Sequence, residues 1–121
     1  MKVLLVDDDA FLRDMYALKF KGSGHEVETA ESAASAFRSL ETEDDFDAIV
    51  LDMIMPSMTG VEMIQEIKVK FPNSKAKFIV LSNQGQQEDI NKATQAGAIG
   101  YIIKAESIPS DVVTKVEDLC K

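Results

Sequence analysis

The sequence predicts an α/β fold in which five parallel strands form a doubly wound sheet with five helices on its two faces. Two patterns in the 121 residues indicate this class. Short apolar runs of strand length alternate with longer segments whose apolar residues recur at helical spacing. Three of the short runs are apolar throughout, which is typical of parallel strands buried on both faces.

Five segments are expected to be strands. The fully apolar runs are residues 3–6, 48–51 and 78–81, and residues 26–30 and 101–103 supply the other two. All of these runs are too short for a helix, and turn-forming or polar residues flank them.

The first helix is expected at about residues 10–21. Its apolar stripe is expected to consist of Phe11, Met15 and Leu18, which recur at helical spacing. The glycines at positions 22 and 24 should end the helix, because glycine tolerates the backbone conformation that follows a last turn.

Four further helices follow the later strands. Pro72 and Gly97 mark the ends of two of them, and Pro109 is a favourable first residue for the last. The apolar residues in each recur every three or four positions, so each helix can cover the sheet. The expected ranges are about 32–41, 61–71, 86–96 and a helix beginning near Pro109.

The strict alternation of strand and helix implies right-handed crossovers between parallel strands. For five strands we expect the order 2-1-3-4-5, which defines a flavodoxin-like sheet. In such a sheet ligands bind outside the carboxyl ends of the strands, where the winding direction reverses. Here that point lies between the first and third strands.

Composition limits the class of protein further. The 121 residues are 45% hydrophobic, which suits one globular domain spanning residues 1–121. The net charge of −8 disfavours direct binding to nucleic acid or anionic lipid, and no apolar run is long enough for a bilayer. A single cysteine, Cys120, and a single histidine, His25, exclude zinc sites and cysteine–histidine nucleophiles. We expect a cytoplasmic protein.

Polar residues follow four of the five expected strands. Three aspartates, Asp7, Asp8 and Asp9, come directly after the first strand. Asp52 follows the third strand, Ser82 the fourth and Lys104 the fifth. Because the carboxyl ends of parallel strands meet at one edge of a sheet, we expect these side chains to converge on one pocket.

This combination of groups suits phosphoryl transfer. Several carboxylates close together repel one another, and a hard divalent cation such as Mg²⁺ relieves that repulsion. A metal ion, a lysine and a hydroxyl can then stabilise a transferring phosphoryl group. A carboxylate in such a pocket can act as the nucleophile and form an acyl phosphate.

Each of these residues taken singly has an ordinary structural interpretation. Asp8 or Asp9 could cap the first helix, and Asp52 could be a turn residue. Ser82 could cap a helix or form a turn, and Lys104 could be a solvated surface lysine. The functional hypothesis therefore depends on the joint pattern, in which four strand ends supply complementary groups.

The motifs resemble those of the receiver domains of two-component response regulators, the group that includes the single-domain chemotaxis regulator. The resemblance covers about residues 2–120. Its motifs are Val-Asp-Asp at 6–8, Leu-Asp-Met-Ile-Met-Pro at 51–56 with Thr-Gly at 59–60, Leu-Ser at 81–82, Gly-Ala at 97–98 and Tyr-Ile-Ile-Lys at 101–104.

The resemblance implies a role for each acidic residue. Asp52 would be the phosphoacceptor, supplied by a phosphohistidine on a sensor histidine kinase or a phosphotransfer protein. Asp8 and Asp52 would bind Mg²⁺ through their side chains, and Asp7 mainly through a water. The backbone carbonyl of Ile54 would be a further metal ligand.

The resemblance also implies a conformational switch. Lys104 would pair with the bound phosphoryl group, and the hydroxyl of Ser82 would turn towards it. Tyr101 would move inward with Ser82, which would alter the face formed by the fourth helix, fifth strand and fifth helix. A downstream target protein or effector domain would recognise that change. Pro56 and Gly60 would shape the loop after the acceptor.

Three positions depart from the family pattern. Ala105 stands where the family usually has a proline after a cis bond, and a cis bond before alanine costs about 3 kcal/mol. The Lys104–Ala105 bond is therefore either trans or strained. Asn83 is bulkier than the usual residue and is expected to restrict access to the acceptor. The loop at residues 106–108 leaves the start of the last helix uncertain.

Three other functions fit the sequence less well. A phosphatase with an Asp-x-Asp motif could use Asp7 and Asp9, but Phe11 stands where threonine or valine is expected. A module that keeps the fold without phosphorylation would not need the acids, Ser82 and Lys104. A flavin-binding protein would need a phosphate loop rich in hydroxyls and glycine, and this loop is acidic. We expect no turnover beyond the chain's own phosphorylation and dephosphorylation.

The sequence leaves the wider context open. It identifies neither the cognate kinase nor the output, and it does not give the lifetime of the phosphorylated state. It also leaves open the oligomeric state, and whether the chain is a complete regulator or part of a longer one.

Overall fold

The computed structural model describes all 121 residues, and its strands form one parallel sheet. The strand order is β2-β1-β3-β4-β5, so the predicted flavodoxin-like order is confirmed. The strands are β1 Lys2–Val6, β2 Glu26–Ala30, β3 Ala48–Leu51, β4 Lys77–Ser82 and β5 Ala98–Ile103.

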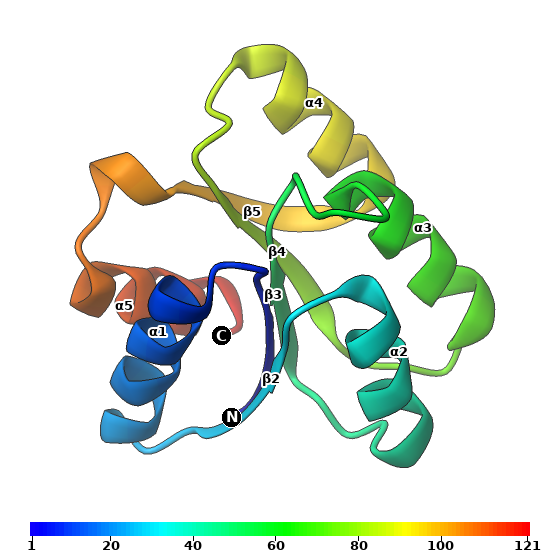
Figure 1. Ribbon diagram of the computed structural model, residues 1–121, viewed down its shortest axis with the longest axis horizontal. Helices are drawn as coiled ribbons and strands as arrows, with labels where there is room; N and C mark the ends of the chain where they lie inside the picture. Colours follow the sequence, from blue (N-terminus) through cyan, green and yellow to red (C-terminus); the bar gives the residue numbers. More distant parts are fainter.

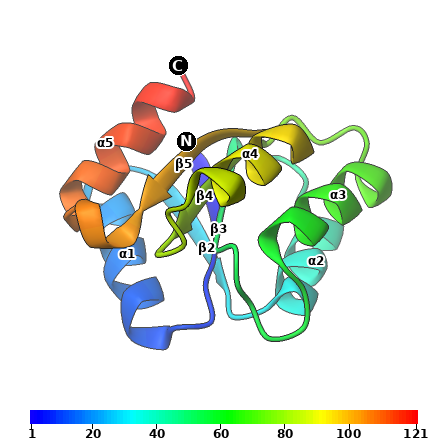
Figure 2. The ribbon, with the colours of Figure 1, turned by 90° about the horizontal axis from the view of Figure 1, so that it is seen from above.

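Helices cover both faces of this sheet (Figures 1 and 2). The helices α1 and α5 lie on one face, and α2, α3 and α4 lie on the other. None of them combines the length and hydrophobicity that a membrane span requires. Their ranges are α1 Ala10–Gly22, α2 Ala33–Thr42, α3 Gly60–Lys70, α4 Gln87–Ala96 and α5 Pro109–Leu119, and a short 3-10 helix covers Lys104–Glu106.

The sheet separates two apolar cores. Successive side chains of a strand point to opposite faces, so Val3 and Leu5 join the core under α1 and α5. Leu4 and Val6 join the core under α2, α3 and α4. All four side chains are at most 1% exposed, which explains why the central strands are apolar without alternation.

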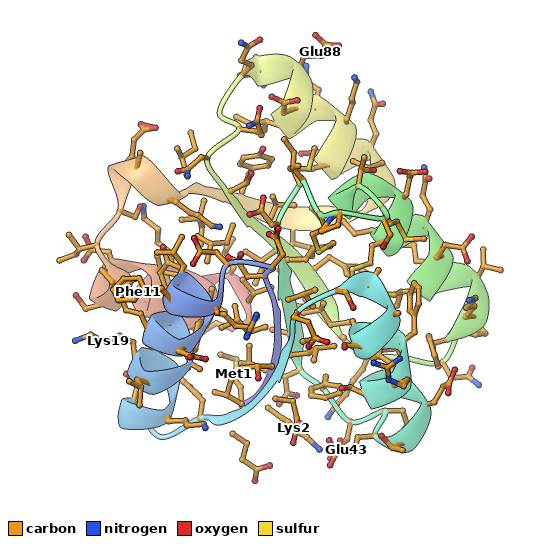
Figure 3. All side chains as sticks on the ribbon, viewed as in Figure 1. Met1, Lys2, Phe11, Lys19, Glu43 and Glu88 are labelled. Atoms are coloured by element: carbon orange, nitrogen blue, oxygen red, sulfur yellow. The ribbon has the colours of Figure 1, made fainter.

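The predicted apolar stripe of α1 is wrong. Phe11, labelled in Figure 3, is 76% exposed and Leu18 is 71% exposed. The helix instead buries Tyr16, Ala17 and Phe20. Apolar residues occur on more than one side of this helix, and the direction in which the chain leaves β1 decides which side meets the sheet.

The beginning of α3 is fixed by local chemistry. The Thr59 hydroxyl accepts a hydrogen bond from the Glu62 amide at 3.1 Å, and the Glu62 carboxylate accepts one from the Thr59 amide at 3.0 Å. This capping box satisfies two backbone donors that a helix start otherwise leaves free. It places Gly60 directly against the chain that leaves β3.

One strand boundary differs from the expectation by three residues, and the start of α2 differs by one. The strand β5 begins at Ala98 rather than at residue 101, because Gly97 and Gly100 interrupt its apolar pattern. Gly97 has φ +120°, a conformation that side chains rarely adopt, and it ends α4 abruptly enough for β5 to start at the next residue. Ser32 is the N-cap of α2 rather than its first residue.

Candidate functional site

Three carboxylates meet at the carboxyl edge of the sheet. Asp7 and Asp8 follow β1, and Asp52 follows β3, which is the neighbouring strand. One oxygen of each carboxylate lies within 4.8 Å of the other two. Asp7 is buried, Asp52 is half-buried and Asp8 is exposed, so the cluster forms a pocket that opens to solvent.

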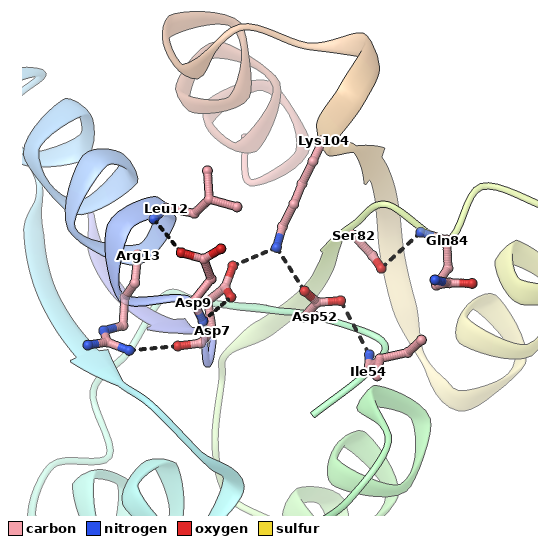
Figure 4. A network of polar contacts seen from close by, with 9 residues as sticks. All are labelled: Asp7, Asp9, Leu12, Arg13, Asp52, Ile54, Ser82, Gln84 and Lys104. Carbon is pink, nitrogen blue, oxygen red and sulfur yellow. Dashed lines mark hydrogen bonds and ion pairs between the residues drawn. The ribbon is translucent and has the colours of Figure 1, made fainter. Parts of the chain in front are cut away.

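Lys104 neutralises the two deeper carboxylates (Figure 4). Its Nζ lies 2.7 Å from Oδ2 of Asp7 and 2.8 Å from Oδ2 of Asp52. Burial alone would lower the pKa of Lys104, but the hydrogen bonds to Asp52 and Asp7 outweigh it, so the pKa lies above its ordinary value. The ammonium therefore stays charged between the two acids.

Hydrogen bonds hold the loop between β1 and α1 in place. Oδ1 of Asp7 accepts a hydrogen bond from the Asp9 amide at 2.9 Å, and Nη1 of Arg13 donates to the Asp7 carbonyl at 2.9 Å. The Asp9 carboxylate accepts from the Leu12 amide and caps α1. Asp9 thus has the ordinary helix-capping role, which leaves it outside the acidic pocket and disfavours the Asp-x-Asp phosphatase.

The loop after β3 brings one backbone donor to the Asp52 carboxylate. Oδ1 of Asp52 accepts a hydrogen bond from the Ile54 amide at 3.2 Å. Gly60 packs so closely that an added Cβ would lie 2.5 Å from the Asp52 carbonyl oxygen. The absence of a side chain at this position therefore sets the path of the loop.

Ser82 and Tyr101 are both attached to Gln84 of the β4–α4 loop. The Ser82 hydroxyl is buried and accepts a hydrogen bond from the Gln84 amide at 3.2 Å. The Tyr101 hydroxyl donates to the Gln84 carbonyl. Ser82 therefore forms a turn and does not cap α4, whose N-cap is Gln86.

The Lys104–Ala105 bond is trans, since the chain contains no cis peptide bond. Ala105 therefore takes the place of the usual proline without a cis bond. The lysine begins the 3-10 helix Lys104–Glu106, and α5 then begins at Pro109 as expected.

The donor set fits a hard divalent cation. Neighbouring oxygens around an octahedral Mg²⁺ lie about 3 Å apart, whereas the three carboxylate oxygens lie within 4.8 Å of one another, so they would need to close by up to about 2 Å. The pocket offers only oxygen ligands and remains open on the Asp8 side, which leaves positions for water or phosphate oxygens. Asp7, Asp8 and Asp52 could hold such an ion.

Three residues near the pocket were not identified from the sequence. Arg13 holds the Asp7 carbonyl, and Gln84 links Ser82 to Tyr101. Tyr16 is buried, and the pKa of its hydroxyl is raised by that burial and modified by the charges of Lys104, Asp7 and Asp52. Only Arg13 carried a sequence signal, because it lies one helical turn after the cap residue Asp9.

The strand order makes this a flavodoxin-like domain, and its carboxylate cluster and opposing lysine lie at the edge where such sheets bind ligands. The sequence pattern of the response regulator receiver domain matches residues 3–117. The chain belongs to this family, whose members act in two-component signalling, and Mg²⁺ and aspartyl phosphate are typical of it.

Known relatives agree with this assignment. The chain is 37% identical to the chemotaxis protein CheY of Thermotoga maritima, covering 99% of this chain and 98% of that protein. It is 36% identical to CheY of Halobacterium salinarum, covering 98% and 95% of the two chains. The transcriptional regulatory protein ResD of Bacillus subtilis is 30% identical, and the match covers 99% of this chain but 48% of ResD.

Solved structures are similar over nearly the whole chain. A CheY-like receiver domain from Methanospirillum hungatei has a TM-score of 0.86 at 28% identity, covering 98% of this chain and 92% of that one. CheY4 of Vibrio cholerae has a TM-score of 0.87 at 27% identity, covering 98% and 97%. Such proteins are signalling proteins rather than classical enzymes.

Proposed function

We propose that residues 1–121 form one receiver domain that accepts a phosphoryl group on Asp52 from a histidine kinase or a phosphotransfer protein. The observation that carries this proposal is the shared position of Asp7, Asp8 and Asp52 with Lys104 bonded to two of them. The carboxylates can bind a divalent ion, and the lysine can bind a phosphoryl group beside it. Phosphoryl transfer requires both kinds of stabilising charge in one pocket.

Asp52 is the nucleophile in this mechanism. A carboxylate oxygen forms a bond to phosphorus while the phosphorus–nitrogen bond of the donor phosphohistidine breaks, and the leaving imidazole takes up a proton. Asp8 and Asp52, with Asp7 and the Ile54 carbonyl in support, would hold a Mg²⁺ ion, which would supply positive charge to neutralise the transferring group. Lys104 exchanges its contact with Asp52 for one with the phosphoryl oxygens.

The donor docks on apolar residues around the pocket. Phe11, Ile54 and Ile108 are 76%, 59% and 62% exposed, and they lie in the segments that follow β1, β3 and β5. A donor must place its phosphohistidine over Asp52, so its neighbouring surface must cover the mouth of the pocket. Apolar contacts at this rim supply binding energy without competing with the acidic residues for the metal.

Phosphorylation acts on Ser82 and Tyr101 through Gln84. The phosphoryl group adds about −1.5 to −2 charges and attracts the Ser82 hydroxyl as a donor. The contact of Ser82 with the Gln84 amide is then lost, and the segment that also holds Tyr101 is released. Tyr101 moves inward, and the face of α4, β5 and α5 changes for a downstream target protein or effector domain.

The proposal is tested by phosphorylation with acetyl phosphate and Mg²⁺, followed by mass spectrometry of the intact protein. The expected result is one added phosphoryl group that the Asp52→Asn variant does not acquire. The Asp45→Asn variant, altered at an exposed aspartate away from the pocket, should be labelled like the natural protein. Labelling of the Asp52→Asn variant, or labelling without magnesium, would contradict the proposal that Asp52 accepts the phosphoryl group with the help of Mg²⁺.

A further inference from the structure

Asp8 is the member of the carboxylate cluster that makes no contact of its own. The other two members, Asp7 and Asp52, are both bonded to Lys104. The Asp8 side chain is exposed and forms neither a hydrogen bond nor an ion pair with the protein. Nothing at the carboxylate itself fixes its direction, so the backbone on either side of Asp8 must aim it at the cluster.

Two hydrogen bonds hold the peptide units on either side of Asp8. The unit between Asp7 and Asp8 is planar, so the direction of the Asp7 carbonyl also fixes the Asp8 amide and Cα. That carbonyl accepts a hydrogen bond from Nη1 of Arg13 at 2.9 Å (Figure 4). The next unit is held through the Asp9 amide, which donates to Oδ1 of Asp7 at 2.9 Å. Of these two contacts, that of Arg13 comes from outside the cluster.

Arg13 is firmly placed to make this contact. It lies in the first turn of α1, where its amide donates to the Asp9 carbonyl at 2.9 Å, and the helix buries Tyr16 and Phe20 against the sheet. No carboxylate lies within 4.0 Å of its guanidinium, and its one side-chain hydrogen bond goes to the Asp7 carbonyl. In this acidic protein, the arginine thus uses its charge to hold a backbone carbonyl.

We propose that Arg13 is a positioning residue for magnesium binding, because it orients the Asp7–Asp8 peptide so that the Asp8 carboxylate faces Asp7 and Asp52. The inference rests on the proposed function, which supplies the ion. Residues that orient metal ligands typically contribute about ten- to a hundredfold to metal affinity.

The arginine acts on a nearby cation in two opposite ways. Its hydrogen bond orients a ligand and favours binding, whereas its positive charge repels the ion. Removal of the side chain therefore separates the two effects by sign. Loss of the orienting contact weakens magnesium binding, and loss of the charge alone would strengthen it.

The test is a titration of the whole ¹⁵N-labelled protein with MgCl₂, without a phosphoryl donor, followed by amide chemical shifts. In Arg13→Met the Kd for magnesium should rise about tenfold or more. The ratio to the natural protein should persist between about 0.1 M and about 1 M NaCl, because salt screens a distant charge but does not restore a lost hydrogen bond. Arg13→Lys keeps the charge and a donor, and its Kd should lie within about threefold of the natural value.

A second readout needs no metal. In Arg13→Met without magnesium, the amide resonances of Asp8 and Asp9 should shift, whereas that of Val50, buried in the central strand β3, should stay in place. This comparison shows whether the loop has changed while the fold is kept.

The matched control is Arg38→Met, which lowers the net charge equally. Arg38 is exposed on α2, and its guanidinium donates to the Ser35 hydroxyl at 3.1 Å, so its loss should change the magnesium Kd by no more than about twofold. The inference is overturned if Arg13→Met binds magnesium as tightly as the natural protein or more tightly. It is also overturned if Arg13→Lys is as weak as Arg13→Met, or if Arg38→Met loses as much affinity.

These outcomes are distinct from failure of the proposed function. If the natural protein bound no magnesium, the proposed metal chemistry would fall and this inference with it. Normal magnesium binding by Arg13→Met, together with normal labelling of Asp52, would overturn the role of the arginine alone.

Discussion

Lys104 decides the charge balance of the acidic pocket. Two half-buried or buried carboxylates, Asp7 and Asp52, lie within 2.8 Å of its ammonium, whose side chain is only 8% exposed. Without a counter-ion these two carboxylates would repel each other. The same lysine therefore stabilises the fold before phosphorylation and stands ready to contact the phosphoryl group afterwards.

Replacing this lysine by methionine should destabilise the protein at pH 7. Removal of one partner of a buried ion pair costs about 3–5 kcal/mol, because the remaining charges are left uncompensated. Magnesium should restore more stability to Lys104→Met than it adds to the natural protein, since the ion replaces the missing charge. Urea denaturation with and without Mg²⁺ measures both effects.

The control for this experiment is Lys92→Met, which removes an exposed lysine paired with Glu88 at 3.1 Å. Exposed pairs contribute about 0–1 kcal/mol, so this variant should remain close to the natural protein. Equal losses of unfolding free energy in the two lysine variants would show that the buried contacts of Lys104 stabilise the protein no more than an exposed ion pair does.

At the level of elements, two neighbouring aspartates at the start of α1 have different roles, one in the carboxylate cluster and one as the helix cap. Asp8 belongs to the carboxylate cluster, whereas Asp9 caps α1 through the Leu12 amide. We expect Asp9→Ala to cost about 1 kcal/mol in unfolding free energy and to leave magnesium affinity within about twofold. Asp8→Ala should leave the unfolding free energy nearly unchanged and should reduce the magnesium affinity at least about tenfold.

Magnesium titrations of both variants, read by amide shifts at the pocket, distinguish these outcomes, and thermal unfolding gives the stabilities. A loss of magnesium affinity in Asp9→Ala as large as in Asp8→Ala would contradict the division of roles between the two neighbouring aspartates.

The start of α3 couples a second element to the pocket. Gly60→Ala would place a Cβ 2.5 Å from the backbone oxygen of Asp52, so the loop after β3 must move. We expect lower stability together with slower phosphorylation by acetyl phosphate. Thr59→Ala removes only the cap, and should cost about 0.5–2 kcal/mol with little effect on the phosphorylation rate of the folded protein.

Phosphorylation rates under conditions where both variants are fully folded provide the comparison. Similar rates for Gly60→Ala and the natural protein would mean that the close approach of α3 does not position Asp52.

At the scale of the whole molecule, the helices differ in how much apolar side chain they bury against the sheet. The helices α1 and α5 bury large side chains such as Phe20 and Val116 against the sheet, whereas α4 buries only Ala93 and Ala96. Less apolar area holds α4 in place, so its contact with the sheet is the weaker one. The helix that the proposed switch must move is thus the one that packing restrains least.

Global stability should fall at alkaline pH. The pKa of Lys104 lies above its ordinary 10.5 in the folded protein, and burial raises the pKa of Tyr16 above 10.0. As the pH rises past about 10, the unfolded chain loses these protons first, so the unfolding free energy decreases. The contribution of Lys104 is fully present below pH 10.5 and is lost as the pH passes the pKa of the folded protein.

Urea denaturation between about pH 8 and 11.5 checks this dependence, because the slope of stability against pH reports the difference in bound protons. The Lys104→Met variant lacks one of the groups whose pKa is raised in the folded protein, and it should show a shallower alkaline decrease of the unfolding free energy. An alkaline slope of equal size in both proteins would assign the effect to other groups.

Several features of the fold and the pocket were predictable from the sequence because they follow from local patterns. The runs at β1, β3 and β4 are apolar throughout, and such strands must be buried on both faces. The topology rules then bring Asp7, Asp52 and Lys104 to one edge. The end of α4 at Gly97 and the start of α5 at Pro109 likewise follow from the properties of single residues.

Other features were decided only by the tertiary structure. The sequence by itself determined which segments are strands and helices, their order and which acids could meet, because periodicity, caps and crossover rules are local or topological. Packing alone decided that Phe11 faces solvent, that Arg13 donates to the Asp7 carbonyl, and that Gln84 links Ser82 to Tyr101. These facts depend on distances between segments far apart in the chain, and no pattern within one segment contains them.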